Sequence, residues 1–283
     1  MVLFPNCKIN LGLRVTGKRA DGYHDIETIF YPLPLYDALE ATTSSLVKET
    51  TSPFDLTITG IPIPGDTANN LCRKAWEIIK EAFPAIAPVR MYLHKAIPTG
   101  AGLGGGSSDG AHTLLLLNEE LQLNLSTEKL LEYALRLGSD CPFFILNKPC
   151  FATGRGEKME DIEVNLSGYY FVVIHPGIHV DTGEAFKSLD KIDDAKRAPS
   201  LKNIISQPVP TWRDKLVNDF EEPVFKKHPG IKNIRQLLYD SGAEYAAMTG
   251  TGSSVFGIFH NSKKTGNLKT SDKYRIYTLN QHT

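Results

Sequence analysis

The stretch PTGAGLGGGSS, Pro98 to Ser108, decides how this chain is expected to fold. Five glycines fall within the seven positions from Gly100 to Gly106. Glycine lets backbone N–H groups turn toward an anion without a Cβ clash, and a following helix adds its unpaired N–H groups and positive dipole end. A helix is predicted after the loop, over residues 109–123, and the hydroxyls of Ser107 and Ser108 can bind phosphate or a metal. The loop therefore favours a nucleotide polyphosphate as ligand.

A dinucleotide-binding fold is the first alternative, because three glycines of the loop, at positions 100, 102 and 105, satisfy G-x-G-x-x-G. That fingerprint needs a strand ending just before the glycines and an acidic residue ending the next strand about 20 residues later. Pro98 interrupts the approach, and the acidic candidates Glu119 and Glu120 fall in the predicted helix or at its end. The context of the fingerprint is therefore missing.

Two other phosphate-binding classes lack their motifs. No Lys-Ser or Lys-Thr follows Gly105 or Gly106, as a Walker A loop requires, and the chain contains neither H-R-D nor D-F-G of the protein kinases. A flexible glycine linker is the remaining alternative. The strand pattern before the loop and the helix after it argue against a linker.

Composition limits the class of partner. With 283 residues the chain is long enough for two domains, and its net charge of −1 provides no basic footprint for nucleic acid or an anionic membrane. A small molecule is the expected partner. The N-terminus is apolar for only four residues, unlike a signal peptide, and the best apolar run, Tyr169 to Ile174, is a buried-strand pattern. We expect a cytoplasmic protein, and the sequence does not indicate its oligomeric state.

The four cysteines are expected to be reduced packing residues. They form no C-x-x-C pair and lack the neighbouring histidines of a zinc site: Cys7, Cys72, Cys141 and Cys150.

Hydrophobic periodicity predicts a mixed α/β chain. In the first half, alternation places Lys8 and Asn10 on one face of the first strand. The predicted strands are 2–15, 26–36 and 55–59, forming an antiparallel sheet, and 89–97; the predicted helices are 70–83 and 126–137, the latter with Ser126 as N-cap.

The second half begins after a polar, glycine-rich segment at 148–157, which is the best candidate for a domain boundary. A second small-residue loop, Thr249 to Ser254, lies between two predicted strands. The segment 190–215 is expected on the surface. The predicted strands are 169–175, 243–248 and 254–259, and the predicted helices are 182–189 and 230–241.

Three motifs together resemble the GHMP kinases, the family of galactokinase, homoserine kinase, mevalonate kinase and phosphomevalonate kinase. They are the glycine loop, the early Lys8 with Asn10, and the late loop Thr249 to Ser254. The resemblance covers essentially the whole chain. It implies an α/β (α+β) fold with an N-terminal ribosomal-S5-domain-2-like ATP domain at 1–152, a C-terminal ferredoxin-like domain at 153–283, and an active site in the cleft between them.

Within this family, the turn RADGYH at 19–24 and the segment LGSDCP at 137–142 indicate a cytidylyl substrate. The resemblance implies ATP-dependent phosphorylation of the 2-hydroxyl of 4-diphosphocytidyl-2-C-methyl-D-erythritol, in the non-mevalonate isoprenoid pathway. Asp140 matches the base that takes the hydroxyl proton, and Lys8 matches the cation near the transferred phosphoryl group. Considered singly and without the resemblance, Asp140 would be interpreted as a carboxylate that caps a helix end, and Lys8 as an exposed lysine of a strand.

Ligand contacts are implied in the same way. Tyr23 and His24 match the cytidine-binding pair, although a hairpin turn with an aromatic lid is the alternative there. Phe186 matches the aromatic residue on the other face of the base, and Asn10 a substrate-side polar position. The implied ATP site consists of Asn70 and Lys95, near adenine and ribose, with Pro98, Thr99, Gly100, Ala101, Gly102, Leu103, Gly104, Gly105, Gly106, Ser107 and Ser108, while the loop Thr249 to Ser254 closes over the phosphates.

Two points of the site stay open. After Ser108 the chain has Asp109-Gly110 where many relatives have Asn-Ala; the carboxylate either weakens nucleotide binding slightly or points away. Mg²⁺ is expected with ATP, but no acidic pair identifies its ligands, so Ser107 and Ser108 are only candidates. Another GHMP small-molecule kinase, of homoserine or mevalonate type, and a non-catalytic nucleotide-binding relative are the alternative functions.

Overall fold

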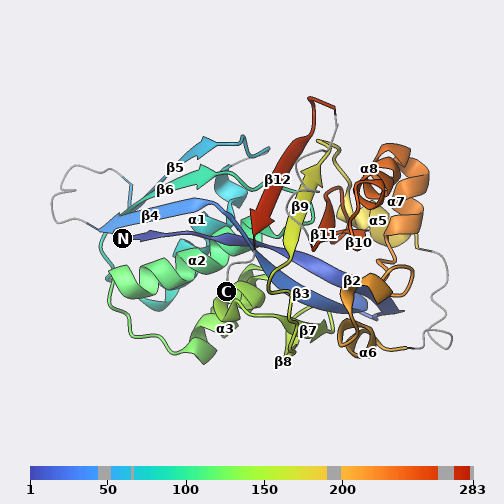
Figure 1. Cartoon of the computed structure of the whole chain (residues 1–283). Helices are drawn as coiled ribbons and strands as arrows, with labels where there is room; N and C mark the ends of the chain where they lie inside the picture. Colours follow the sequence, from blue (N-terminus) through green and yellow to red (C-terminus); the bar gives the residue numbers. More distant parts are fainter. Residues whose placement is uncertain (44–51, 65–66, 190–198, 261–270, 281–283) are drawn as a thin grey trace. The chain divides into compact units, whose positions relative to one another are not determined.

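The structure, a computed structural model, describes residues 1–43, 52–64, 67–189, 199–260 and 271–280 (Figure 1). The chain forms two compact units. Unit 1 comprises residues 1–7, 35–99 and 104–147, and unit 2 comprises residues 8–34, 100–103 and 148–283. Neither unit is continuous in sequence, because the chain passes between them several times. The mixed α/β composition is as expected, and the division into domains at residue 152 stays a prediction.

Unit 1 contains one four-stranded sheet, in the order β1 (Val2–Leu3), β4 (Ala38–Thr43), β6 (Val89–Lys95) and β5 (Phe54–Gly60). β5 runs parallel to β6, with Leu56 opposite Met91, whereas the other neighbours are antiparallel. The prediction that the segment 55–59 joins an antiparallel sheet with the first two strands is therefore wrong. A helix lies between β5 and β6 in sequence, and such a crossover makes parallel pairing possible.

The α-helices in the described part of unit 1 are α1 (Leu71–Ala82), α2 (Gly105–Glu120), α3 (Thr127–Leu137) and α4 (Cys141–Leu146). α1 and α2 lie beside the sheet (Figure 1). Ser126 caps α3 as predicted, its hydroxyl accepting from the Lys129 N–H at 3.3 Å. α2 begins earlier than expected, inside the glycine run. Its first residue, Gly105, packs closely on Ile97, and a Cβ there would lie 2.8 Å from the Ile97 side chain.

Unit 2 contains two four-stranded sheets. One has the order β2 (Asn6–Lys18), β3 (His24–Tyr36), β7 (Cys150–Thr153) and β8 (Lys158–Asp161), although the ends of β2 and β3 belong to unit 1. The other has the order β10 (Tyr245–Met248), β11 (Val255–Phe259), β9 (Tyr170–His175) and β12 (Arg275–Asn280), all antiparallel. The predicted strands of this half are present, and β12 is an addition to them.

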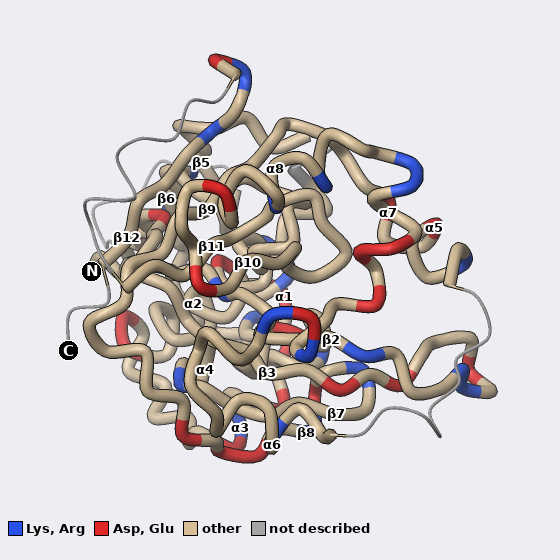
Figure 2. Tube along the Cα trace, turned by 45° about the vertical axis from the view of Figure 1, so that its right-hand side comes forward, with Lys and Arg blue, Asp and Glu red and all other residues tan. Residues whose placement is uncertain are grey.

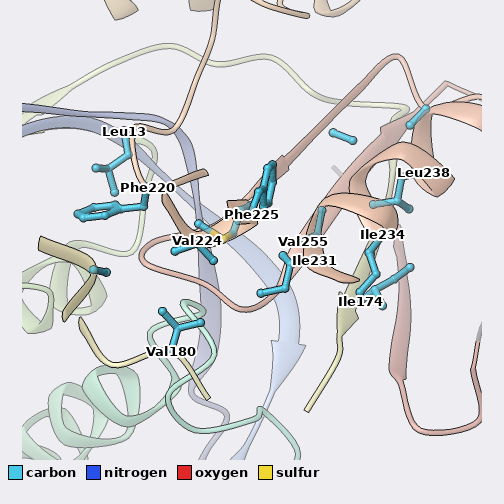
Figure 3. Close-up of a cluster of buried hydrophobic side chains, with 14 of the residues drawn as sticks. Leu13, Ile174, Val180, Phe220, Val224, Phe225, Ile231, Ile234, Leu238 and Val255 are labelled. Atoms are coloured by element: carbon cyan, nitrogen blue, oxygen red, sulfur yellow. The ribbon is translucent and has the colours of Figure 1, made fainter. Parts of the chain in front are cut away.

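The helices of unit 2 are α5 (Thr182–Lys187), α6 (Leu201–Ile205), α7 (Glu221–Lys227) and α8 (Pro229–Asp240). Apolar side chains of α7 and α8 form a buried core with those of β9 and β11 (Figure 3). Ile231, Ile234 and Leu238 occupy one face of α8, as the helical spacing predicts.

The expectation that the segment 190–215 lies on the surface is wrong for its second part. Leu201, Ile204 and Trp212 are buried, because the apolar residues of this short segment fall on one side of α6 and of the turn after it. Residues 190–198 lie outside the described part of the chain.

The cysteines, the charged residues and the apolar character of the helices can be followed in the structure. All four cysteines are free and buried. Basic and acidic residues are both spread over the described trace, and neither sign is confined to one part of it (Figure 2). Among the described helices, none has the length and apolar character needed to cross a membrane.

Truncation of one core side chain tests this account of unit 2. Ile231 is completely buried in the core of Figure 3. Ile231→Ala is expected to lower the free energy of unfolding by about 2–5 kcal/mol, since it removes buried methyl groups and leaves a cavity. Denaturant unfolding measures the change. Lys232→Ala, at an exposed position of the same helix, is the control and is expected to change it by less than about 0.5 kcal/mol; equal losses would contradict the account.

Candidate active site

The first half of the glycine loop and the second small-residue loop lie against each other in unit 2. The Ser254 N–H donates to the Ala101 carbonyl at 3.2 Å, and the Thr249 hydroxyl donates to the Gly102 carbonyl at 3.0 Å. Gly102 has φ +78°, and a Cβ there would lie 2.0 Å from the Thr249 carbonyl oxygen. Two segments almost 150 residues apart in sequence thus meet at a position that only glycine fits.

Asn10 is the centre of a buried hydrogen-bond network in the same unit. Its Oδ1 accepts from Lys8 Nζ at 2.7 Å and from the Gly250 N–H at 3.0 Å. It also lies 3.2 Å from the Thr249 hydroxyl oxygen, whose single hydrogen is shared between Asn10 Oδ1 and the Gly102 carbonyl. Its Nδ2 donates to the Thr28 hydroxyl at 2.9 Å. The amide group therefore ties the lysine to the second loop, and the role of Asn10 as a substrate contact stays a prediction.

Lys8 is not an exposed strand lysine. Only 4% of its surface is exposed, its Nζ lies 4.8 Å from the centroid of the Phe30 ring, and its backbone N–H donates to the Leu103 carbonyl at 2.9 Å. The residue is held from both ends: the backbone by the glycine loop and the ammonium group by Asn10. Such fixation is what a cation needs if it is to act at a defined position.

Two of the three aromatic residues expected at the cytidine, His24 and Phe186, are in contact in unit 2. The rings of His24, at the start of β3, and Phe186, on α5, stack with centroids 4.8 Å apart and an interplanar angle of 19°. Phe220 packs edge-on against Phe186, at 4.8 Å. Tyr23, the residue before His24, is 57% exposed, so much of its ring is open to solvent. Large aromatic surface left in water is typical of a binding site.

Arg155 is a neighbour of Tyr23 that sequence reasoning missed. Its guanidinium carbon lies 5.0 Å from the Tyr23 ring centroid, in the range of a cation–π contact. Arg155 lies in the turn after β7, and the Glu157 carboxylate accepts from its N–H at 2.6 Å. The only sequence signal was an arginine between two glycines, Gly154 and Gly156, and nothing in that pattern indicates Tyr23 as its partner.

Asp140 and the second half of the glycine loop belong to unit 1. Asp140 precedes α4 as its N-cap residue, but its side chain does not cap the helix. The neighbouring Cys141 thiol is hydrogen-bonded to Ser107 in the first turn of α2, and burial together with the Asp140 charge raises the pKa of this thiol to about 12. The cysteine is thus an inert packing residue, and the end of the loop lies close to Asp140.

The start of α2 is free of side-chain caps. Gly104, at φ +71°, precedes the helix without a capping hydrogen bond, and a Cβ on Gly106 would meet nothing within 4 Å. An uncapped helix start beside open space fits an anionic group. Ser107 is half-buried and Ser108 fully buried, with its hydroxyl 3.3 Å from His112 Nδ1; of the two hydroxyls, that of Ser107 has the more open environment.

The remaining residues of the expected ATP site differ in exposure. Thr99 and Gly100 are exposed, whereas Pro98 is buried. The Asn70 Oδ1 caps α1 by accepting from the Cys72 N–H at 2.8 Å. The Lys95 side chain is completely buried and is paired with the carboxylates of Asp37 and Asp109. A direct contact of Lys95 with adenine or ribose stays a prediction, and its observed partners are these carboxylates.

The unusual pair after Ser108 has a packing explanation. Asp109 points into unit 1, where Lys95 Nζ donates to its Oδ2 at 2.6 Å, rather than toward a ligand. At Gly110 a Cβ would lie 2.9 Å from the Leu71 Cβ, so α2 passes the start of α1 too closely for a side chain. Of the two possibilities open from the sequence, the carboxylate points away.

The described residues contain no group of three or more histidine, cysteine, aspartate or glutamate side chains able to hold a metal ion. A divalent cation at this site would depend on phosphate and water oxygens for most of its ligands, as Mg²⁺ with nucleotides usually does.

A substitution at Gly102 tests the contact between the two loops. Gly102→Ala is expected to destabilise unit 2 by roughly 1–3 kcal/mol, because the added Cβ collides with the Thr249 carbonyl and the backbone has a positive φ. Thermal unfolding would then begin several degrees lower. Gly106→Ala is the control: it adds a Cβ in open space within a helix and is expected to keep or raise the unfolding temperature. A drop for Gly106→Ala alone would contradict this assignment.

Comparisons with known proteins agree on the family. The sequence model of the GHMP kinases N-terminal domain matches residues 70–148, and that of the GHMP kinases C-terminal domain matches residues 200–269. A curated 4-diphosphocytidyl-2-C-methyl-D-erythritol kinase of Bacteroides fragilis (strain YCH46) is 48% identical over 264 residues, covering 93% of this chain and 94% of the relative.

Solved structures give the same result. A crystal structure of 4-(cytidine 5'-diphospho)-2C-methyl-D-erythritol kinase aligns with a TM-score of 0.79 and 29% identity, covering all of both chains. The mevalonate kinase of Methanococcus jannaschii aligns with a TM-score of 0.74 over 100% of this chain and 98% of its own, but at 16% identity it shares the fold alone. The two-domain α/β GHMP fold expected from the sequence is confirmed, and the chain belongs to the GHMP kinase family.

Proposed function

We propose that this chain transfers the γ-phosphoryl group of ATP to the 2-hydroxyl of 4-diphosphocytidyl-2-C-methyl-D-erythritol, giving the 2-phosphate and ADP. The 48% identity to a curated kinase of that name, over 93% of the chain, is the observation that carries the proposal. The reaction belongs to isoprenoid precursor synthesis by the methylerythritol phosphate route. A cytoplasmic location is part of the same proposal.

The chemistry assigned to each residue follows from its environment. The Asp140 carboxylate, which does not cap its helix, accepts the proton of the 2-hydroxyl as that oxygen attacks phosphorus. Lys8, held by Asn10 and the glycine loop, stabilises the negative charge on the transferred phosphoryl oxygens. In phosphoryl transfer the protein mainly positions groups and compensates charge, so a carboxylate base and a fixed ammonium group fit this task.

The donor nucleotide is assigned to the glycine loop. The uncapped start of α2 and the open space at Gly106 fit a phosphate group, and the loop Thr249 to Ser254 supports the other half of the glycine run. Mg²⁺, when bound with ATP, would neutralise part of the phosphate charge. The half-buried Ser107 hydroxyl is the residue of this chain best suited to contact it or the phosphate.

Specificity for a cytidylyl substrate is assigned to the aromatic residues of unit 2. Tyr23 offers an exposed ring with Arg155 over it, and the His24–Phe186 stack offers a second flat surface with a polar edge. Pyrimidine rings stack on aromatic side chains, and a histidine nitrogen can hydrogen-bond the edge of the base. Neither homoserine nor mevalonate has a base to stack, so these rings favour the cytidylyl substrate over those alcohols.

Removal of the charge at Asp140 tests the role of the base. Asp140→Asn is expected to lower kcat by about 10²–10⁴-fold, because the amide cannot accept the hydroxyl proton, while nucleotide affinity stays near that of the unchanged protein. Steady-state kinetics and nucleotide titration measure the two quantities. Asp55→Asn, at an exposed position of β5, is the control. A full rate in Asp140→Asn would remove this residue from the chemical step.

The stacking role of Tyr23 is tested by comparing how its removal changes KM for the cytidylyl substrate and KM for ATP. Tyr23→Ala is expected to raise KM for the cytidylyl substrate roughly 5- to 150-fold, the range set by stacking energies of about 1–3 kcal/mol, and to leave KM for ATP unchanged. Tyr92→Ala, which removes another exposed tyrosine, is the control. Equal increases in both KM values would contradict the stacking role.

A further inference from the structure

Three charged side chains of unit 1 lie together in its interior, although no step of the reaction uses them. Lys95 Nζ donates to Asp109 Oδ2 at 2.6 Å and is also paired with Asp37 Oδ2. The side chains of Lys95 and Asp37 have no exposed surface, and that of Asp109 is only 4% exposed. Burying three ionisable groups carries a large desolvation cost, which their mutual attraction and hydrogen bonds must offset.

These groups are attached to the two stems of the glycine loop. The Asp37 Oδ1 accepts from the N–H groups of Ala96, at 2.6 Å, and Ile97, at 2.9 Å, which directly precede the loop. Asp109 follows the loop, in the second turn of α2. Lys95, at the end of β6, connects the two carboxylates. The entering and leaving stems are thus joined through a single ammonium group.

We propose that Asp37, Lys95 and Asp109 form a loop clamp that fixes the spacing of the two stems and thereby sets the affinity of the glycine loop for nucleotide phosphates. The three are positioning residues, since they act through the backbone of Ala96, Ile97 and α2. The proposal deepens the proposed function and rests on ATP binding at this loop. It also gives a role to the buried lysine that precedes the loop and is paired with two carboxylates.

The two carboxyl groups of the loop clamp are held differently. Asp37 accepts three hydrogen bonds, whereas the Asp109 Oδ1 is buried with no hydrogen-bond partner in the described part of the chain. The attachment of the Asp109 side chain to the entering stem therefore depends on Lys95. Asp109→Asn still offers an oxygen to Lys95, so it keeps the hydrogen bond that joins α2 to the clamp.

The first test measures the Kd of a non-hydrolysable ATP analogue by calorimetry at pH 7, using the full chain. Asp109→Ala is expected to raise Kd about tenfold or more, because it frees the leaving stem while Lys95 keeps Asp37. Asp109→Asn is expected to stay within about twofold of the unchanged protein. Glu119→Gln, which alters an exposed carboxylate of the same helix, is the control. An unchanged Kd in a folded Asp109→Ala protein would overturn the proposal.

The second test does not depend on the folding of Asp109→Ala. Kd for the analogue is measured at pH 7 for Asp37→Asn, which keeps an acceptor oxygen for the Ala96 and Ile97 N–H groups but replaces the carboxylate oxygen paired with Lys95 by an amide NH₂ group. Kd is expected to rise several-fold. An unchanged Kd in a folded Asp37→Asn protein would overturn the clamp.

Failure of the clamp can be distinguished from failure of the proposed function. The analogue reports binding at the glycine loop without turnover, so the clamp is tested even if the cytidylyl substrate is not phosphorylated. Turnover of that substrate by the unchanged protein, together with an unaltered Kd in Asp109→Ala, would leave the function intact and discard the clamp.

Discussion

The close approach of Gly102 to Thr249 is the constraint on which unit 2 and the proposed active site depend. At this point the backbone of one loop passes so near the other that a Cβ would lie 2.0 Å from a carbonyl oxygen. The same contact brings Thr249 and Gly250 to Asn10, and through Asn10 to Lys8. The position of the proposed catalytic cation therefore follows from a packing requirement between three distant segments of the chain.

In unit 1 the other half of the loop is held by charged groups as well as by close packing. Asp37, Lys95 and Asp109 connect the strand that enters the loop with the helix that leaves it, and Gly105 and Gly110 allow that helix to pack on Ile97 and Leu71. The glycine run thus serves two purposes. Some of its glycines allow other segments of the chain to pack closely against the loop. Others, such as Gly106, leave space that a ligand can occupy.

Local signals in the sequence predicted most of the strands and helices, the cap of α3 and the family, because each depends on residues close together in the chain. The parallel pairing of β5 with β6 and the burial of Leu201 and Trp212 could not be predicted, since both depend on contacts between distant segments. The same limit applies to the site. The motifs of Lys8, Asp140 and the glycine loop were recognisable, whereas the Lys95 partner Asp37, 58 residues away, and the Arg155 contact with Tyr23 carry no local signal.

The central claim is that one chain combines a phosphoryl-transfer site with a pocket for a cytidylyl alcohol. The most direct test is to measure ADP release by the purified protein with Mg²⁺ and ATP, in parallel reactions with 4-diphosphocytidyl-2-C-methyl-D-erythritol, homoserine and mevalonate. The account predicts turnover with the cytidylyl compound alone. Turnover with another alcohol but not with the cytidylyl compound, or nucleotide binding without any turnover, would contradict it.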